Sequence, residues 1–225
     1  SRGRELIAAV RQAGIPLVIN AHHPSLAEVD TLASDHEAGG YLLTRWLIEH
    51  GRRRILRYHP DPLPDGEIRE WLMARDAGHE RAMAEAGLEI LPPVFPQFSA
   101  NIPEGPAAFD ASRKITAAHL AEHILCANPI DAIMAPSDGE TSYLAAACRL
   151  LGKEPGRDVL ISGYDNYWKD SWLRSLEPAI PAVTMDKQNR LVGRQLVQLM
   201  LDRIAGRLPA EPQHQLVPPL LVVPA

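Results

Sequence analysis

The sequence predicts an α/β protein built on a parallel sheet that helices cover on both faces. Three observations predict this class. Helix and strand patterns alternate along almost the whole chain. The strand patterns are short, apolar and non-alternating, which is typical of parallel strands buried on both faces. The helical patterns carry apolar residues at helical spacing, so each helix has one face to bury against a sheet.

The composition allows a large core and narrows the possible partners. The chain has 225 residues, of which 46% are hydrophobic, enough for one large domain or two lobes. A net charge of −5 argues against a nucleic-acid-binding surface on this chain alone. No apolar run approaches the roughly 20 residues of a membrane span, and no signal-peptide pattern opens the chain. We expect a soluble, cytoplasmic protein, although a secreted chain whose signal was removed would begin similarly.

The first 90 residues predict helices and strands in turn. The helices are expected at residues 5–13, 34–50 and 70–86, and the strands at 15–20, 29–34 and 55–58. Each helix is followed by a glycine, a common helix stop. The second helix opens with Ser34-Asp-His-Glu37, a capping-box pattern. Residues 59–67 contain three prolines, a glycine and three acids, which predicts a loop.

The rest of the chain continues the alternation after a proline-rich, irregular segment at residues 91–106. Helices are expected at 111–127, 137–151 and 187–205, and strands at 94–95, 132–135, 159–162, 182–185 and 216–223. Ser137-Asp-Gly-Glu140 is a second capping-box pattern. Pro218-Pro219 interrupts the last strand, which favours a sheet edge. Cys126 and Cys148 lie in Ala-rich helical stretches, which favours buried free thiols over a disulfide.

Polar residues follow three of the predicted strands, where open parallel sheets bind their ligands. They are Asp35 and His36, Ser137 and Asp138, and Asp165 and Asn166. The first two pairs can equally be helix caps. No helical pattern directly follows Asp165, so the alternative there is a turn-forming Asx motif.

Three further candidates have ordinary structural alternatives. Arg75 lies in an Ala-rich helix and can be a solvated surface charge. Phe109 precedes a predicted helix and can be a hydrophobic staple against it. Trp168 and Trp172 are four residues apart and can form one face of a short packed helix.

Enzyme and metal signatures are absent from the sequence. It contains no GxGxxG, GxxxxGK[ST] or GxSxG motif. His22 and His23 are adjacent and precede a proline, which is typical of a loop rather than a metal site, and no HExxH or Cys-x-x-Cys pattern occurs. We therefore expect no catalytic residues, no metal and no cofactor.

Five segments together resemble the effector-binding domains of the lactose-repressor/galactose-repressor (LacI/GalR) transcription factors. They are "SDHEAGGYLLTRWLIEHGRRRI", "ARDAGHERAMAEAGL", "DAIMAPSDGETSYLAAACRLLG", "GRDVLISGYDN" and "PAVTMDKQNRLVGRQLVQLMLDRIAG". They follow in the order and at the spacings of that family and cover nearly the whole chain. No single segment is specific, so the resemblance rests on all five in order.

The resemblance implies a type I periplasmic-binding-protein-like fold, with two doubly wound parallel-sheet lobes and a ligand between them. One lobe would hold residues 1–53 and 184–207, and the other residues 54–183 and 208–225. The family's helix-turn-helix headpiece and the opening β/α units of its first lobe have no counterpart here. The first lobe is therefore expected to be N-terminally truncated.

The resemblance also implies the site. The family's effector contacts fall on Arg75, Phe109, Ser137 and Asp165; Asp35 and Trp168 would line the cleft, and Arg69 is a further candidate. Ser137 stands where the family usually has Asn, so the family's ligand does not simply carry over. Asp165 can accept hydrogen bonds from two vicinal hydroxyls of a sugar, and Arg75 can donate a fork of them. Phe109 or Trp168 can pack against the apolar face of the sugar ring.

The function implied is that of an effector-binding, dimerising domain of a bacterial LacI-type transcriptional regulator. It would sense a sugar or similar small molecule and control DNA binding allosterically through a headpiece absent from this chain. Its partners would be the effector, operator DNA through that headpiece, and a second copy in a homodimer, with no membrane. The alternative is a periplasmic sugar-binding protein of a transporter. The Gly-Tyr-Asp-Asn segment, the unpaired cysteines and the missing signal peptide favour the regulator.

Overall fold

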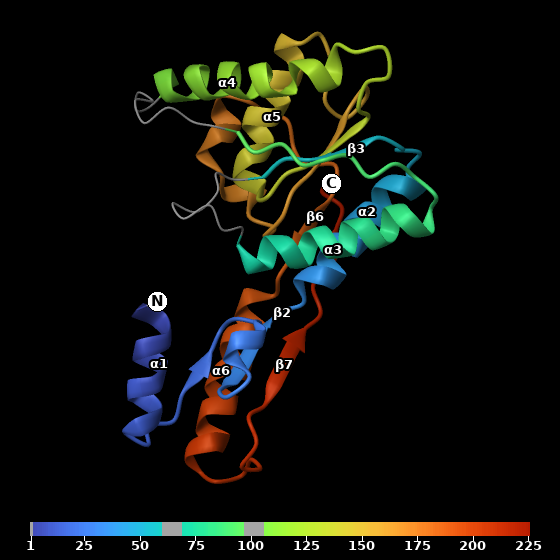
Figure 1. Cartoon of the computed structure of the whole chain (residues 1–225). Helices are drawn as coiled ribbons and strands as arrows, with labels where there is room; N and C mark the ends of the chain where they lie inside the picture. Colours follow the sequence, from blue (N-terminus) through green and yellow to red (C-terminus); the bar gives the residue numbers. More distant parts are fainter. Residues whose placement is uncertain (1, 60–68, 97–105) are drawn as a thin grey trace. The chain divides into compact units, whose positions relative to one another are not determined.

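A computed structural model describes residues 2–59, 69–96 and 106–225 and divides the chain into two compact units (Figure 1). The first unit comprises Ser1–Asp35 and Lys187–Pro219, and the second comprises His36–Asp186 and Leu220–Ala225. Each unit contains a parallel sheet with helices beside it, so the predicted α/β class is confirmed.

The first unit is a small three-stranded sheet in the order β1-β2-β7, all parallel. Its elements are α1 (Arg2–Gln12), β1 (Val18–Ile19), β2 (Asp30–Ser34), α6 (Asn189–Ile204) and β7 (His214–Val217), with a short 3-10 helix, η1 (Pro24–Leu26). Leu32 and Val217 of the sheet pack against Val192 and Leu199 of α6. The apolar spacing of α6 therefore buries one face of that helix, as its sequence pattern predicts.

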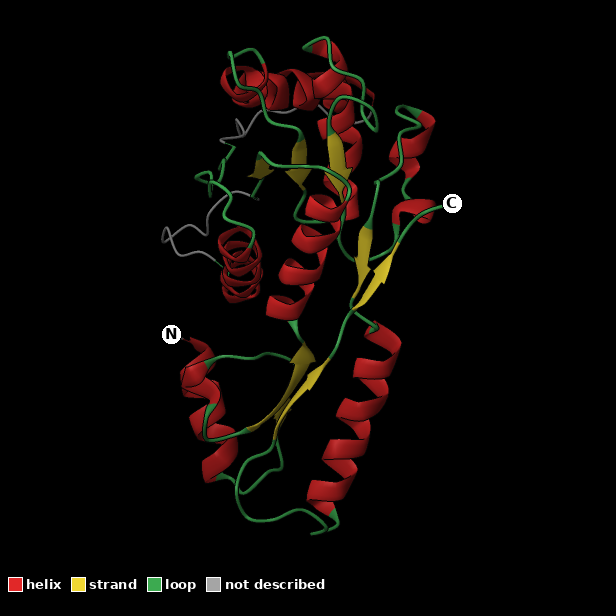
Figure 2. Ribbon diagram, turned by 90° about the vertical axis from the view of Figure 1, so that its right-hand side faces the viewer, coloured by secondary structure: helices red, strands yellow, loops and turns green. Residues whose placement is uncertain are grey.

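The second unit is built on the parallel sheet β3-β4-β5, with helices on both faces (Figures 1 and 2). The strands are β3 (Ile55–Arg57), β4 (Ala132–Met134) and β5 (Leu160–Ser162). The helices α2 (His36–Glu49) and α3 (Glu70–Glu85) cover one face, and α4 (Pro106–Ile124) and α5 (Asp138–Leu150) cover the other.

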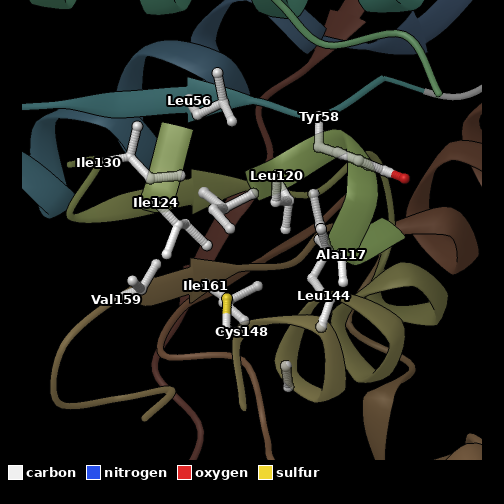
Figure 3. Close-up of a cluster of buried hydrophobic side chains, with 14 of the residues drawn as sticks. Leu56, Tyr58, Ala117, Leu120, Ile124, Ile130, Leu144, Cys148, Val159 and Ile161 are labelled. Carbon is white, nitrogen blue, oxygen red and sulfur yellow. The ribbon is translucent and has the colours of Figure 1, made fainter. Parts of the chain in front are cut away.

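Strand residues alternate between these two cores, because successive side chains of a strand point to opposite faces. Leu56, Ile133 and Ile161 join the core beneath α4 and α5, where Leu120 and Leu144 meet them (Figure 3). Ile55, Ala132 and Leu160 join the core beneath α2 and α3. Both faces are apolar, which is why the strands read as continuous hydrophobic runs.

The predicted last strand is two strands in separate units. Pro218 and Pro219 divide residues 216–223 into β7, which pairs with β2, and β8 (Leu220–Val222), which pairs antiparallel with β6 (Thr184–Asp186) (Figure 2). Proline lacks the backbone N–H that donates hydrogen bonds between strands. Pro218 and Pro219 therefore end the pairing of β7 before the pairing of β8 begins.

The boundaries of the compact units differ from the predicted lobes. Helix α2 was expected in the first lobe, but its Leu43 and Leu47 lie in the core of the second unit with residues of β3, β4 and β5. Residues 208–219 were expected in the second lobe, but β7 belongs to the first unit because it pairs with β2. Sequence patterns report amphipathic faces but do not reveal which sheet covers them.

Three local predictions also change. Helix α4 begins at Pro106 rather than residue 111, which suits a proline in the first turn of a helix, so Phe109 lies inside the helix and not before it. The box predicted at Ser34 does not form: Ser34 ends β2, and its Oγ has no hydrogen-bond partner among the described residues. Both cysteines are free, but only Cys148 is buried and Cys126 is exposed.

Helices α2 and α3 cross at a distance that only glycine allows. A Cβ at Gly40 would lie 2.1 Å from the carbonyl oxygen of Arg75, and a Cβ at Gly78 would lie 2.0 Å from the carbonyl oxygen of Glu37. Backbone atoms cannot move aside as a flexible side chain can, so the crossing depends on these glycines. It fixes where Arg75 of α3 lies relative to the start of α2.

We predict that Gly78→Ala destabilises the second unit by about 1–3 kcal/mol, as overpacking of a well-packed contact does. Alanine has a higher helix propensity than glycine, which by itself would stabilise the helix. A net loss of stability in Gly78→Ala therefore identifies the clash. Gly193→Ala is the matched control, because nothing lies within 4 Å of a Cβ at this position in α6; it should stabilise by about 0.5–1 kcal/mol. Urea unfolding measures both, and equal stabilisation by the two variants would contradict the close crossing.

Candidate functional site

A small pocket with a mixed apolar and polar lining lies in the second unit at the carboxyl ends of β3 and β4, where open parallel sheets bind ligands. Its volume is about 20 Å³, room for about one water molecule. The pocket can therefore form part of a ligand site but cannot enclose a ligand alone. Its lining comprises Gly40, Leu43, Arg57, Tyr58, His59, Leu72, Arg75, Asp76, Met134, Ala135, Pro136 and Tyr164.

A larger hollow of about 560 Å³ opens between Pro92–Val94 and the last turns of α4. This hollow lies along the side of the sheet, where Val94 pairs with Tyr58, and none of the predicted site residues lines it. We therefore place the candidate site at the smaller pocket, which Arg75 lines.

Arg75 is the buried cation of this pocket, with 8% of its surface exposed. Its guanidinium carbon lies 3.3 Å from the centre of the Tyr164 ring and 4.3 Å from that of Trp71. Nη1 donates to the carbonyl of Pro136 at 2.7 Å, and Nε donates to Nδ1 of His36 at 3.3 Å. Burial lowers the pKa of the Arg75 guanidinium, while Tyr164 and Asp165 act to raise it. The aromatic rings and acceptors hold the cation in a fixed orientation.

The sequence pattern at Arg75 does not reveal that Tyr164 and His36 hold it. The Tyr164 hydroxyl lies 3.4 Å from His36 Nδ1, and a Cβ at Gly39 would lie 2.1 Å from that hydroxyl. Glycine at position 39 therefore lets Tyr164 reach the start of α2. The only sequence signals were the histidine after β2 and the tyrosine of Gly-Tyr-Asp-Asn.

Ser137 is the N-cap of α5, as the sequence pattern predicts. Its Oγ accepts a hydrogen bond from the amide of Gly139 at 3.2 Å and donates to Oε2 of Glu140. The hydroxyl of Tyr167 lies 3.1 Å from the same oxygen and also accepts from the Gly139 amide, at 2.9 Å. The role of Ser137 as a ligand contact remains a prediction, since these three groups occupy its hydroxyl.

Asp138 fixes the segment that follows β5. Its Oδ2 accepts from the amides of Tyr167 at 2.7 Å and Trp168 at 3.0 Å, and its Oδ1 accepts from Oγ1 of Thr184 at 2.7 Å. Burial raises the pKa of the Asp138 carboxyl, and these three hydrogen bonds oppose that rise. The sequence around Asp138 indicates only a polar strand-end residue or a helix cap, because its partners lie 29 to 46 residues further on.

Asp165 and Asn166 lie in the left-handed region of backbone conformation, with φ of +92° and +56°. Such conformations cost non-glycine residues of order 1–3 kcal/mol and persist only where neighbouring contacts enforce them. Here the Asp165 amide donates to Met185 at 2.7 Å, and Nδ2 of Asn166 donates to Oδ2 of Asp186 at 3.1 Å. The strained turn supports the prediction that Asp165 has a function beyond turning the chain.

Of the seven predicted contacts, only Arg75 is among the described residues that line the pocket. Phe109 is buried against Tyr143, with ring centres 5.2 Å apart. Trp168 is only 5% exposed, whereas Trp172 is 60% exposed, so the two do not share one packed face. Arg69 directly precedes α3, and Asp35 lies in the first unit. Their roles as ligand contacts stay predictions.

A partly buried network of charged side chains links the end of β3 to α3, the helix that carries Arg75. Nη1 of Arg57 lies 3.3 Å from Asp76 and 2.8 Å from Glu80, and Nε2 of His59 lies 3.0 Å from Asp76. His79 completes this region; it is fully buried and shares a 3.0 Å hydrogen bond with Thr44.

Neither a metal centre nor a membrane anchor is found in the part of the chain that the structure describes. No three His, Cys, Asp or Glu side chains in it come together in a way that could hold a metal ion. Within the same residues, no helix is long and apolar enough to cross a bilayer.

These features define a ligand-binding α/β domain, and comparisons with known proteins agree. The family described as "Periplasmic binding protein-like domain" matches residues 44–224. The HTH-type transcriptional repressor PurR of Aliivibrio fischeri (strain MJ11) is 27% identical over 195 residues, covering 86% of this chain and 52% of that protein. The chain therefore spans about half the length of the curated relatives it matches.

Solved structures give the same result. A regulatory protein of the LacI family from Chloroflexus aggregans superposes with a TM-score of 0.74 and 25% identity, over 97% of this chain and 71% of that one. The transcriptional regulator CelR in complex with cellobiose superposes with a TM-score of 0.70 and 24% identity. The superposition covers 95% of this chain and 59% of that one and shows the shared fold.

The chain belongs to the periplasmic binding protein-like family. Within it, the chain is related to the effector-binding domains of LacI-type transcriptional regulators, so the predicted fold and resemblance are confirmed.

We predict that His79 makes the protein acid-sensitive. Burial, and then the charge of Arg57, lower its pKa from 6.5 to about 3. Below pH 6.5 His79 binds a proton in the unfolded chain but stays neutral in the folded chain. The free energy of unfolding therefore falls by about 1.4 kcal/mol per pH unit as the pH falls toward 3.

Unfolding in urea between pH 7 and pH 4 measures this loss. His79→Leu should be less sensitive to pH than the wild type, whereas His22→Gln, which changes an exposed histidine, should retain the wild-type dependence. Equal pH slopes in the wild type and His79→Leu would rule out His79 as the source.

Proposed function

We propose that this chain is the effector-binding domain of a LacI-type transcriptional regulator that senses a sugar or similar small molecule. The observation that carries the proposal is the 27% identity to an HTH-type transcriptional repressor across 86% of the chain. The small pocket at the carboxyl ends of β3 and β4 would form part of the effector site.

The residues at the strand ends support a ligand that offers hydroxyl groups. Arg75 is oriented by its rings and acceptors to donate hydrogen bonds, and Asp165 can accept two from vicinal hydroxyls. CelR, which shares the fold, has been solved with cellobiose. Arg75 and Asp165 are therefore the direct contacts we propose in the second unit. Ser137 would act through the hydroxyl of Tyr167, which it hydrogen-bonds, and Phe109, Trp168, Asp35 and Arg69 are further candidates.

The remaining parts of the proposal concern the whole regulator. Operator DNA would bind through a headpiece outside this chain, the regulator would act as a homodimer, and it would work in the cytoplasm without catalysing a reaction. A transporter's periplasmic sugar-binding protein is the less favoured alternative, because the relatives reported above are transcriptional regulators.

The test of function begins with a thermal-shift screen of the full-length protein against sugars, polyols, nucleosides and amino acids. A hit is then added to the protein bound to DNA from upstream of its own gene. We expect the hit to change the DNA affinity at least several-fold in a mobility-shift assay, because an effector that binds one conformation better shifts the equilibrium. Light scattering on the same preparation should give the mass of two chains. Tight ligand binding with no effect on DNA, or no affinity for DNA, would favour the transporter alternative.

We predict that Asp165→Asn weakens binding of the hit about 10- to 100-fold, since a hydrogen bond to a charged group contributes about 1.5–3 kcal/mol. Asp170→Asn is the matched control, because Asp170 is an exposed acid in the same segment. Isothermal titration calorimetry measures the affinities, and circular dichroism checks the fold. Wild-type affinity in Asp165→Asn would remove Asp165 from the site.

A further inference from the structure

The hydroxyl of Ser137 uses its whole hydrogen-bonding capacity inside the protein. A serine hydroxyl has one proton to donate and two lone pairs to accept with. Its contacts are the carboxylate of Glu140, the amide of Gly139 at 3.2 Å and the hydroxyl of Tyr167 at 3.1 Å. The three contacts match the one donor and two acceptors, so Ser137 has no capacity left for a ligand.

The direction of these hydrogen bonds follows from the chemistry of the partners. An ionised Glu140 can only accept, so the Ser137 proton goes to Glu140. The Tyr167 hydroxyl must then donate its own proton to Ser137, while its oxygen accepts from the Gly139 amide at 2.9 Å. Tyr167, Ser137 and Glu140 form a one-way relay, in which the Tyr167 oxygen has only acceptor capacity left to offer outward.

Tyr167 is the accessible member of this relay. Its surface is 39% exposed, and it lies in the segment that leaves the carboxyl end of β5. Among the residues that the structure describes, only Ser137 and Gly139 hydrogen-bond to its hydroxyl. The hydroxyl is therefore free to accept one more hydrogen bond from outside the protein.

The same hydroxyl blocks the amino end of α5. Exposed amides at a helix amino end attract phosphate and carboxylate groups. Here the Tyr167 oxygen lies over the first turn so closely that a Cβ at Gly139 would be 2.6 Å from it. Glycine at position 139 makes room for the tyrosine, and the tyrosine takes the place an anion would occupy.

Charge around the relay also disfavours an anion. Burial and then the Glu140 and Asp165 carboxylates act to raise the pKa of the Tyr167 hydroxyl, against the hydrogen bond of Ser137. Burial raises the pKa of Glu140 as well, with Asp165 adding to the rise. Arg75, the buried cation of the neighbouring pocket, takes no part in the hydrogen bonds among Tyr167, Ser137, Glu140 and Gly139. An anionic group of a ligand at Tyr167 would lie near the carboxylates of Glu140 and Asp165 and would face an oxygen that can only accept.

We propose that Tyr167, Ser137 and Glu140 are a specificity element of the effector site, which accepts a hydrogen bond from a hydroxyl or ammonium group and excludes phosphate and carboxylate groups. The inference rests on the proposed function for the existence of an effector. It narrows the effector to a neutral or cationic molecule at this contact, such as an unphosphorylated sugar or an amino sugar.

Inorganic phosphate tests the exclusion without knowledge of the effector. The probe is the amide resonance of Gly139 in protein labelled with ¹⁵N-glycine, which simplifies the spectrum to the 15 glycines of this chain. Phosphate should leave this resonance unchanged in the wild type and in the control Tyr143→Phe, which alters another tyrosine of α5. It should shift the resonance saturably in Tyr167→Phe/Glu140→Gln, which removes the Tyr167 oxygen from the amide and the charge of Glu140. Saturable shifts in the wild type, or none in the double variant, would overturn the proposal.

Matched ligand pairs test the selectivity itself. D-Ribose is compared with ribose 5-phosphate, and cellobiose with cellobionate, by calorimetry on the wild type and Tyr167→Phe. The proposal expects the neutral member to bind at least tenfold tighter, with the preference reduced in Tyr167→Phe. Tighter binding of the anionic member that depends on Tyr167 would overturn it. If no member binds, the phosphate titration alone decides this inference, and the proposed function is judged separately by its own screen.

Discussion

The buried carboxylate of Asp138 is the interaction on which the carboxyl end of the second sheet depends. It accepts two backbone amides of the segment after β5 and the hydroxyl of Thr184 at the start of β6. One side chain at the start of α5 therefore ties together three elements distant in sequence. Because a buried carboxylate is stable only when its lone pairs are used, removing any partner would cost more than one hydrogen bond. The backbone position of Tyr167 follows from this anchor.

Close helix packing supplies the other half of the site. Gly40 and Gly78 let α2 and α3 approach, and Gly39 lets Tyr164 reach His36. Arg75 is then enclosed by two aromatic rings and two acceptors. The two halves have different chemistry, since the Arg75 side is donor-rich and the Tyr167 side offers acceptors. A ligand that spans both would need acceptor and donor groups, which the hydroxyls of a sugar combine.

Much of the fold could be predicted from the sequence, because the short apolar strands and amphipathic helices of a doubly covered parallel sheet have distinctive patterns. The strands β3, β4 and β5 and the helices α2, α3 and α5 lie within a few residues of their predicted positions. The misses share a cause: α4 begins earlier because Pro106 fits a first helical turn, and residues 216–223 divide between units at two prolines. Local patterns do not say which sheet a helix covers, which is why the compact unit that holds α2 differs from the lobe predicted for it.

The sequence by itself determined the class of fold, the helix cap at Ser137, the family and the polar residues that end the strands. These depend on periodicity, turn chemistry and the order of segments, which are local or additive along the chain. Only the tertiary structure decided that Asp138 anchors rather than caps, that Arg75 is enclosed by Tyr164 and Trp71, and that Tyr167 uses the hydroxyl of Ser137. Each of these depends on groups brought together by folding, and the direction of a hydrogen bond is set by all the partners an atom has, not by its neighbours in sequence.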